Sequence, residues 1–350
     1  MCGTNSSSMA PSKSLNMRVS VLLLLIVCGS AEAFSTKKRK TVVEEIKKIN
    51  ENGPYIGLIT VYAPEESAFF ASGAFQSDPK HPFVDLAGRR FRVGKVHNKK
   101  VIYVRCGIGL VNAAAATQNM VDMFEISGII HFGIAGNANS SMSIGDVTIP
   151  TQFADTGLWD WLNPNGTVDS SDFGKLDIGN YNVPRGEGQN LLGHVGYSTE
   201  QFYSESGDPN TPQRVIWLNT TTHWLNLAAN LKGIRLERCV NTSFCLSEEP
   251  KLVVGLKGAT ANTFIDNAAY REFLFQTFHV SSLDMESSAI VMTSLSNGFP
   301  VLVIRGLSDL AGAQKGDNHI QIFGPLAASN TARVVIEFLK TLPNHQHALL

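Results

Sequence analysis

The sequence lacks an excess of either charge. Lysine and arginine together number 29, aspartate and glutamate 30, and the formal net charge of the 350 residues is −1. A chain without a basic surplus has no electrostatic attraction for a phosphate backbone, so we expect no nucleic-acid partner. Its hydrophobic content of 43% is nevertheless sufficient for a large buried core.

Long apolar runs are also absent, since none reaches the roughly 18 residues of a membrane-spanning helix. The short run at 21–28 follows Arg18 and precedes a small-x-small cleavage signal at 31–33, which is the pattern of a secretory signal peptide over 1–33. We therefore predict delivery to the vacuole or the extracellular space, with no membrane partner after signal removal. The alternative is a signal anchor retained beside the basic run 37–40.

Cysteine is scarce, with five in the chain, and no spacing typical of zinc ligands occurs, so we expect no metal. Cys239 and Cys245 are close enough in sequence to form a small disulfide loop in an oxidising compartment. Cys106 lies in an apolar run and is expected to be a free core thiol. Acceptor sequons for N-glycosylation, which suit a secreted glycoprotein, occur at Asn139, Asn165, Asn219 and Asn241.

The chain does contain a series of short apolar runs separated by helical and glycine-rich segments. The runs lie at 56–61, 101–104, 129–132, 146–150, 252–256 and 301–304. Strands that are hydrophobic throughout belong to a sheet covered on both faces, and 112–124 and 331–339 have helical spacing. The pattern predicts a single three-layer α/β domain over 55–343, with a central mixed, mostly parallel sheet covered by helices.

Three segments differ from this pattern. Residues 34–54 precede the first apolar run and form an N-terminal extension, and 344–350 form a frayed tail. The stretch at about 157–250 is rich in Gly, Asn, Pro, Ser and Thr and carries all four tryptophans. It shows one clear helix, near 224–231, and is interpreted as an elaborated insertion that covers a site or an interface.

Two acidic positions occur where elements of the predicted sheet should end. Glu286 precedes a helical segment at 288–297, and Asp309 follows the buried strand at 300–304. Ligands of open α/β sheets collect outside the carboxyl ends of the strands, so both acids are functional candidates. Taken singly, Glu286 is typical of a helix N-terminal carboxylate and Asp309 of a loop aspartate.

Two glycine segments, 106–109 and 133–136, follow predicted strands and permit close approach of a ligand to the backbone. The first lacks the third glycine of the dinucleotide-binding fingerprint, so we expect no such cofactor. A tight strand-to-helix turn is the alternative interpretation of Gly107 to Gly109.

In their order along the chain, these segments resemble the purine nucleoside phosphorylase and nucleosidase superfamily. The resemblance runs from about residue 55 to the C-terminus, apart from the insertion. It rests on 107–109, 133–136, Gly145-Asp146-Val147, 263–265, 285–286 and 308–309. Within the superfamily, the tryptophan-rich insertion and the predicted leader are most similar to plant bark storage and wound-inducible proteins. The family is oligomeric, so the resemblance implies a homo-oligomer.

The resemblance also implies roles for individual residues. Asp309 would be the general acid toward purine N7, with Ser308 orienting it. Glu286 would accept from the ribose hydroxyls while Met285 packs under the sugar, and Phe264 would stack on the base unless it is a plain core residue. The other substrate-binding residues that the resemblance implies are Gly109, Ala135, Gly136, Ile265 and Arg305.

The reaction type depends on the end of the first strand. Glu66 resembles the glutamate with which nucleosidases activate water, although it could be an exposed carboxylate at a helix start. Phosphorylases place an arginine-containing phosphate loop there, and no arginine lies between Tyr55 and Phe83. His131 stands where phosphorylases carry a second arginine, so phosphate lacks two charge partners. Ile134 replaces a serine of the nucleosidases, which predicts weak activity.

These observations predict a purine nucleosidase that hydrolyses the N-ribosidic bond of adenosine-like nucleosides without a cofactor, with Glu66 activating water. Two alternatives stay open. One is a vegetative storage protein that binds purine bases or nucleosides with little turnover, and the other is a phosphate-dependent nucleoside phosphorylase.

Overall fold

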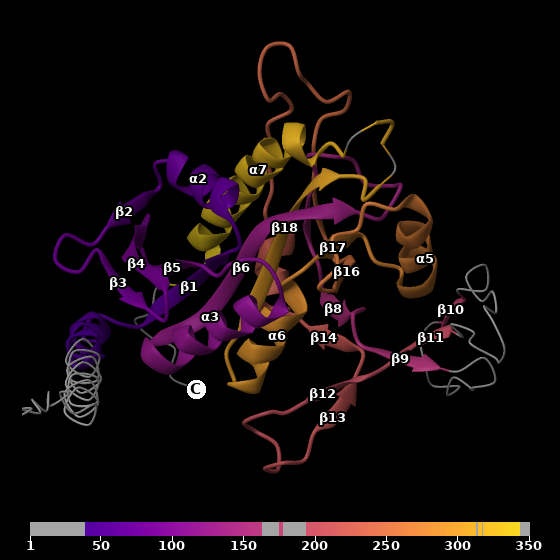
Figure 1. Cartoon of the computed structure of the whole chain (residues 1–350). Helices are drawn as coiled ribbons and strands as arrows, with labels where there is room; N and C mark the ends of the chain where they lie inside the picture. Colours follow the sequence, from indigo (N-terminus) through magenta and orange to yellow (C-terminus); the bar gives the residue numbers. More distant parts are fainter. Residues whose placement is uncertain (1–38, 163–174, 178–193, 313, 317, 344–350) are drawn as a thin grey trace, which may run out of the picture. The chain divides into compact units, whose positions relative to one another are not determined.

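The computed structural model describes residues 39–162, 175–177, 194–312, 314–316 and 318–343 (Figure 1). The predicted signal peptide, the tail at 344–350 and the sequon at Asn165 lie outside these residues. The chain divides into two compact units, 1–48 and 49–350. The described part of the first unit, 39–48, is helical, and every element below belongs to the second unit.

The centre of the sheet is parallel and largely buried. β1 pairs with β5 and β6, and β6 pairs with β18, all in parallel. These strands are β1 (Tyr55–Thr60), β5 (Lys99–Arg105), β6 (Ile126–Asn137) and β18 (Val301–Asp309). Each contains one of the predicted apolar runs, because a strand covered on both faces has no polar alternation. Their carboxyl ends meet at one edge of the sheet.

The sheet continues on both sides of this centre with mixed pairing. One side contains β2 (Phe75–Ser77), β3 (Phe83–Leu86) and β4 (Arg89–Val96), which pair antiparallel. The other side contains β7 (Val147–Ile149), β8 (Gln152–Asp155), β14 (Trp217–Asn219), β15 (Leu252–Val254), β16 (Lys257–Thr260) and β17 (Ser282–Asp284). The predicted mixed, mostly parallel sheet is thereby confirmed. The apolar-run pattern did not predict β2–β4, which contain exposed as well as buried or half-buried positions.

Helices form a layer on each face of the sheet (Figure 1). They are α2 (Ala63–Ala71), α3 (Leu110–Met123), α4 (Thr222–Ala229), α5 (Ala268–Phe278), α6 (Ser287–Ser296) and α7 (Ile320–Thr341). α2 packs against α7 and α3 against α6, while both α6 and α7 contact β18. The expected three-layer α/β architecture is therefore present. Within the described residues, no helix is both long and apolar enough to cross a membrane.

The stretch at 157–250 contains short elements. β9 (Trp159–Leu162), β10 (Lys175–Asp177) and β11 (His194–Tyr197) form a separate antiparallel sheet, and β12 (Glu200–Phe202) pairs with β13 (Gln213–Val215). β14 then rejoins the main sheet, and Trp224 of α4 packs in the core. A disulfide bond joins Cys239 to Cys245, and Cys106 is a buried free thiol, as predicted.

Candidate active site

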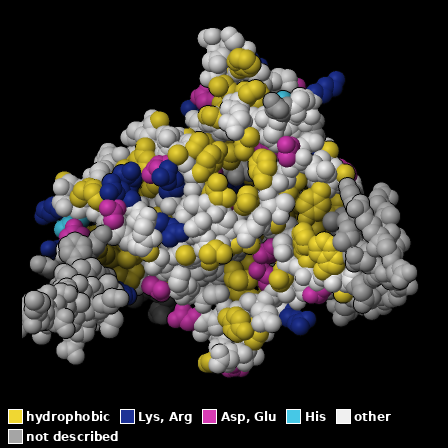
Figure 2. Space-filling view, viewed as in Figure 1, with side chains coloured by type: hydrophobic (Ala, Val, Ile, Leu, Met, Phe, Trp, Pro, Cys, Tyr) yellow, Lys and Arg dark blue, Asp and Glu magenta, His cyan; other side chains and the backbone are white. Residues whose placement is uncertain are grey.

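A cavity of about 180 Å³ lies at the carboxyl ends of β1, β6, β17 and β18. Hydrophobic side chains border a hollow near the ends of β6 and β18 (Figure 2). Of the residues predicted to bind substrate or act in catalysis, those that line the cavity are Ala135, Gly136, Phe264, Ile265, Met285, Glu286, Ser308 and Asp309. Segments far apart in sequence thus supply one site, as expected for the strand ends of an α/β sheet.

Three of the predicted residues do not line the cavity, namely Gly109, Arg305 and Glu66, and the predicted position of Glu66 is corrected here. Its carboxylate does not line the cavity but lies 3.5 Å from Arg92 Nε and 3.2 Å from Arg105 Nη1. Glu65 lines the cavity instead and is 3% exposed. Consecutive residues of a helix point about 100° apart, so only one of this pair can face the strand ends.

The Glu65 carboxylate is held by three backbone N–H groups. Oε2 accepts from Val61 N at 2.7 Å and from Tyr62 N at 3.3 Å, and Oε1 accepts from Ile134 N at 2.8 Å. Burial raises the pKa of Glu65, while Arg305 and the three N–H groups oppose that effect. Glu65 is the third residue of α2 after its N-cap Tyr62. A glutamate there typically turns back onto the N-cap backbone, a signal that could have distinguished it from Glu66.

Asp309 occupies the end of β18 and also lines the cavity. Ser308 Oγ donates to its Oδ1 at 2.6 Å, while Ala311 N and Asn318 Nδ2 donate to its Oδ2 at 3.0 and 3.1 Å. The predicted orientation of Asp309 by Ser308 is therefore seen in the geometry. The contribution of Asn318 was not predicted, because it comes from the segment before α7 and depends on tertiary contact.

Glu286 is a third acid that lines the cavity, and it is the N-cap residue of α6. It accepts from Gly109 N at 2.9 Å and lies 3.6 Å from Arg305 Nη2. Burial raises the pKa of Glu286 to about 7, even though Arg305 opposes the effect. Gly109 does not line the cavity, but its backbone N–H holds the Glu286 carboxylate. Its φ of 96° lies in the region that glycine favours. Gly109 therefore forms the tight strand-to-helix turn and also donates a hydrogen bond to an acid of the site.

Asp284 is a further acid that the sequence analysis did not assign. It lines the cavity and accepts from Arg305 Nε at 3.0 Å and from Ser287 Oγ at 2.6 Å. Burial works against ionisation, yet Arg305 and Ser287 hold the pKa of Asp284 below its ordinary value. Its Oδ1 also accepts from the backbone N–H groups of Glu286 and Ser287, so it fixes the start of α6.

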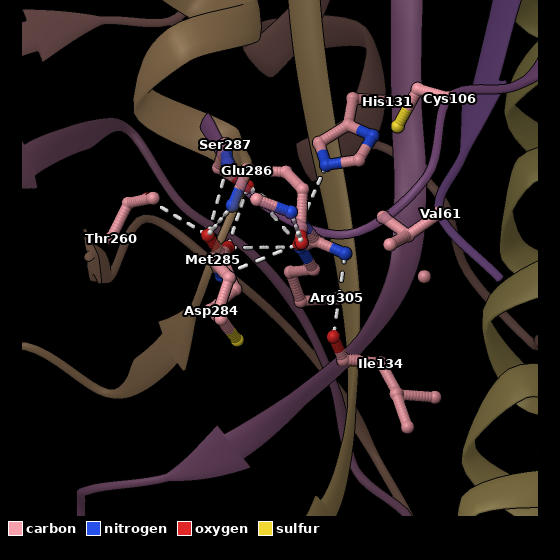
Figure 3. A network of polar contacts seen from close by, with 12 residues as sticks. Val61, Cys106, His131, Ile134, Thr260, Asp284, Met285, Glu286, Ser287 and Arg305 are labelled. Atoms are coloured by element: carbon pink, nitrogen blue, oxygen red, sulfur yellow. Dashed lines mark hydrogen bonds and ion pairs between the residues drawn. The ribbon is translucent and has the colours of Figure 1, made fainter. Parts of the chain in front are cut away.

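Arg305 is fully buried beneath the cavity rather than in its lining. Each of its three side-chain nitrogens donates to a protein group, in a network with Asp284, Glu286, Ser287, His131 and the Ile134 carbonyl (Figure 3). Its positive charge is thus surrounded by acceptors from β6, β17 and α6. We call His131, Asp284, Glu286, Ser287 and Arg305 the buried network.

Apolar side chains form the outer wall of the cavity. Phe264 is 56% exposed and Ile108 is 57% exposed, and both line the cavity. This exposure is incompatible with the alternative in which Phe264 is a packed core residue. Ile134 lines the cavity too, and its side chain packs with Ala327 and Ala328.

Comparison with known proteins identifies the family. The model of the family described as Phosphorylase superfamily matches residues 55–340. The chain belongs to this superfamily. Bark storage protein A of Populus deltoides is 34% identical over 290 residues, which are 82% of this chain and 89% of that protein. A 5′-methylthioadenosine/S-adenosylhomocysteine nucleosidase of Listeria monocytogenes is 31% identical over 267 residues, or 76% of this chain and 92% of the relative.

Solved structures of the superfamily share the fold. The 5′-methylthioadenosine/S-adenosylhomocysteine nucleosidase of Helicobacter pylori, solved with butyl-thio-DADMe-Immucillin-A, has a TM-score of 0.57 and 19% sequence identity. The similarity covers 83% of this chain and 100% of that one. The nucleosidase of Colwellia psychrerythraea, solved with adenine, has a TM-score of 0.56 and 21% identity over 82% of this chain and 95% of its own.

Proposed function

We propose that this superfamily member is a purine nucleosidase that hydrolyses the N-ribosidic bond of adenosine-like nucleosides. The observation that carries the proposal is the placement of Glu65, Glu286 and Asp309 around one cavity. Cleavage passes through an oxocarbenium-like sugar, so the reaction needs a proton for the base, a hold on the ribose and an activated water. One acid is available for each need.

The proposed reaction breaks the bond between ribose C1′ and purine N9, with the bonding electrons leaving on the base. Asp309 delivers a proton to N7, and Glu286 accepts hydrogen bonds from the ribose hydroxyls. A water oxygen forms the new bond to C1′, and its proton passes to Glu65. Phe264 offers an apolar surface for the base, and Met285 one for the sugar. The products are free base and ribose.

Glu65 takes the role that the sequence analysis gave to Glu66. Its carboxylate reaches the cavity, and the three N–H groups that hold it stabilise its ionised form. Burial makes the same carboxylate more basic, since the pKa of Glu65 is raised. A carboxylate with a raised pKa accepts a proton more readily, so this environment suits the activation of water.

Water is favoured over phosphate because the cavity offers phosphate no cation. None of the described residues that line it is a lysine or arginine. Arg305 is nearby, but its nitrogens already donate to the buried network. Burial and Arg305 lower the pKa of His131 well below its usual range, so this ring is neutral. Binding a phosphate dianion would require these contacts to break.

A storage role is the second candidate, because the chain is 34% identical to Bark storage protein A. Ile134 supports it, since a hydrocarbon side chain faces the cavity there and cannot help to hold a water molecule.

We also propose secretory delivery, which the Cys239–Cys245 disulfide supports. The apolar, exposed Ile108 and Phe264 at the cavity support a homo-oligomer in which a second copy shields them.

The deciding experiment incubates the protein with adenosine or inosine, with and without phosphate. We expect free base and ribose at a rate that phosphate does not change. Formation of ribose 1-phosphate would assign the chain to the phosphorylases. Binding of adenine by calorimetry without release of base over hours would instead favour storage.

A further inference from the structure

His131 is a fully buried histidine in the middle of β6, and the proposed reaction does not use it. Its ring contacts β1 through Ile59 and the rest of the buried network through Arg305 (Figure 3). Nδ1 lies 3.0 Å from the Ile59 carbonyl oxygen, and Nε2 is in hydrogen-bond contact with Arg305 Nη2. A histidine in such a position needs a physical account, because an unpartnered ring would be costly to bury.

The contacts determine the tautomer of His131. A guanidinium group can only donate hydrogen bonds, so Nε2 must be unprotonated to accept from Arg305. A carbonyl oxygen can only accept, so Nδ1 must carry the proton that it donates to Ile59. The two charged groups that act on the ring are Arg305 and Asp284, and burial adds to the effect of Arg305 in keeping the ring neutral. His131 is thus a neutral acceptor for a buried cation.

The Arg305 side chain links His131 to two of the proposed functional acids. Its Nη2 lies 3.6 Å from Glu286 Oε2, and its Nη1 donates to the Ile134 carbonyl at 3.3 Å. The N–H of the same residue, Ile134, donates to Glu65 Oε1 at 2.8 Å. The charge of Arg305 opposes the effect of burial on both glutamates. The position of this one guanidinium therefore influences both acids.

We propose that His131 is a positioning residue, whose unprotonated Nε2 fixes Arg305 against the Ile134 carbonyl and thereby keeps the guanidinium charge close to Glu65 and Glu286. An acidic partner in its place would draw the guanidinium away from the two glutamates, and a cationic one would repel it. A neutral acceptor does neither. The proposal rests on the proposed function only for its kinetic consequence, since the tautomer and the contacts are independent of turnover.

Two amide variants separate the hydrogen bond from the volume of the side chain. In His131→Gln the amide oxygen can reach the position of Nε2 and accept from Arg305. In His131→Asn the amide ends one bond earlier, near the position of Nδ1, and can bond Ile59 but not Arg305. If His131 only fills space, the two variants should behave alike.

We expect His131→Gln to retain the wild-type rate. For His131→Asn we expect kcat about tenfold lower at acidic pH, with KM within about twofold and recovery as the pH is raised, because a displaced Arg305 opposes less strongly the effect of burial on the pKa of Glu65. Equal losses in both variants, or a change confined to KM, would overturn the proposal. A melting curve for each variant shows whether it is folded.

A measurement on the unmodified protein tests the tautomer directly. In ¹⁵N-histidine-labelled protein we expect His131 to show a protonated Nδ1 and an unprotonated Nε2 from roughly pH 5 to pH 8. The exposed His279 serves as an internal reference for a ring in water. A protonated Nε2 would overturn the proposal even if both variants failed to fold. If the wild type releases no base, the proposed function fails, whereas the nitrogen shifts still decide the role of His131.

Discussion

Carboxylates and arginines meet at two places in this protein, with opposite surroundings. In the buried network, Arg305 and Asp284 have side-chain exposures of 0% and 1%. In a second group, which we call the exposed cluster, Glu66 contacts Arg92 and Arg105, and Asp85 contacts Arg90. The arginines of the exposed cluster are 38% to 46% exposed, on β4 and β5. Charged side chains of both signs gather where β2–β4 lie (Figure 2).

The comparison shows that residue type does not determine what an ion pair does. In water, the attraction between exposed charges is screened and contributes about 0–1 kcal/mol. Below the cavity, the same groups have perturbed pKa values, fixed positions and no solvent to replace a lost partner. Chemistry is therefore expected where the carboxylates are buried, although the exposed cluster contains the more conspicuous arginines.

The largest expected effect comes from Glu65→Gln, with Glu66→Gln as the matched control one residue away. The amide introduced in place of the Glu65 carboxylate cannot accept a proton from water, so we expect hydrolysis to fall by about a thousandfold. The control should remain within about twofold of the wild type. Steady-state release of free base from adenosine measures both. A larger loss for the control would restore Glu66 to the reaction and refute the comparison.

The second-largest expected effect is a loss of stability on removal of the Arg305 charge. Arg305→Met leaves Asp284 and Glu286 buried without their partner, and the free energy of unfolding should fall by about 3–5 kcal/mol. Urea denaturation followed by tryptophan fluorescence measures the change. Arg92→Met in the exposed cluster is the matched control, with an expected loss of about 1 kcal/mol or less. Similar losses for the two arginines would mean that burial does not distinguish the two groups.

The pH dependence of stability provides an intermediate effect. The pKa of Glu286 is raised from 4.5 to about 7 in the folded protein, so between these values the folded state binds more protons than the unfolded state. Stability from this group is consequently present at low pH and is lost as the pH rises through about 7. Glu286→Gln should flatten this part of the melting-temperature profile. An unchanged slope would show that another group titrates there.

The smallest expected effect concerns salt. Raising the ionic strength to about 1 M should weaken the pairs of Glu66 and change the stability contributed by the exposed cluster by a few tenths of a kcal/mol. The contribution of the buried network should not change, because solvent ions do not reach it. A double-mutant cycle of Glu66 and Arg105, compared with one of Asp284 and Arg305 at two salt concentrations, measures both.

Sequence patterns predicted those parts of the fold that are buried on both faces. β1, β5, β6 and β18 each contain a continuous apolar run, and Glu286 and Asp309 occur directly where such elements begin or end. β3 and β4 were not predicted, because alternating burial and several arginines obscure their strand character. The alternating burial of these strands depends on which face of each strand is covered by a neighbouring element. A local sequence pattern does not contain that information.

The site was predictable to the level of its segments but not always to the single residue. Glu65 and Glu66 are chemically identical neighbours, and they are distinguished only by their places relative to the N-cap Tyr62 and by the rotation of α2 about its axis. His131 could be recognised as a missing phosphate ligand, yet its contact with Arg305 spans 174 residues. Asn318 likewise reaches Asp309 from the segment before α7. Such tertiary contacts leave no periodic signal in one sequence.

Gly133 offers a way to trace how function diverges among relatives. A side-chain carbon at this position of β6 would collide with Glu65 Oε1 and would come within 2.7 Å of Arg305 Nη1. Any substitution there must displace an acid, a cation or both. A gene copy selected only as a nitrogen reserve would be free to accept that mutation, whereas a copy selected for turnover would not. The codon for one glycine could therefore record whether a lineage still depends on the chemistry of its cavity.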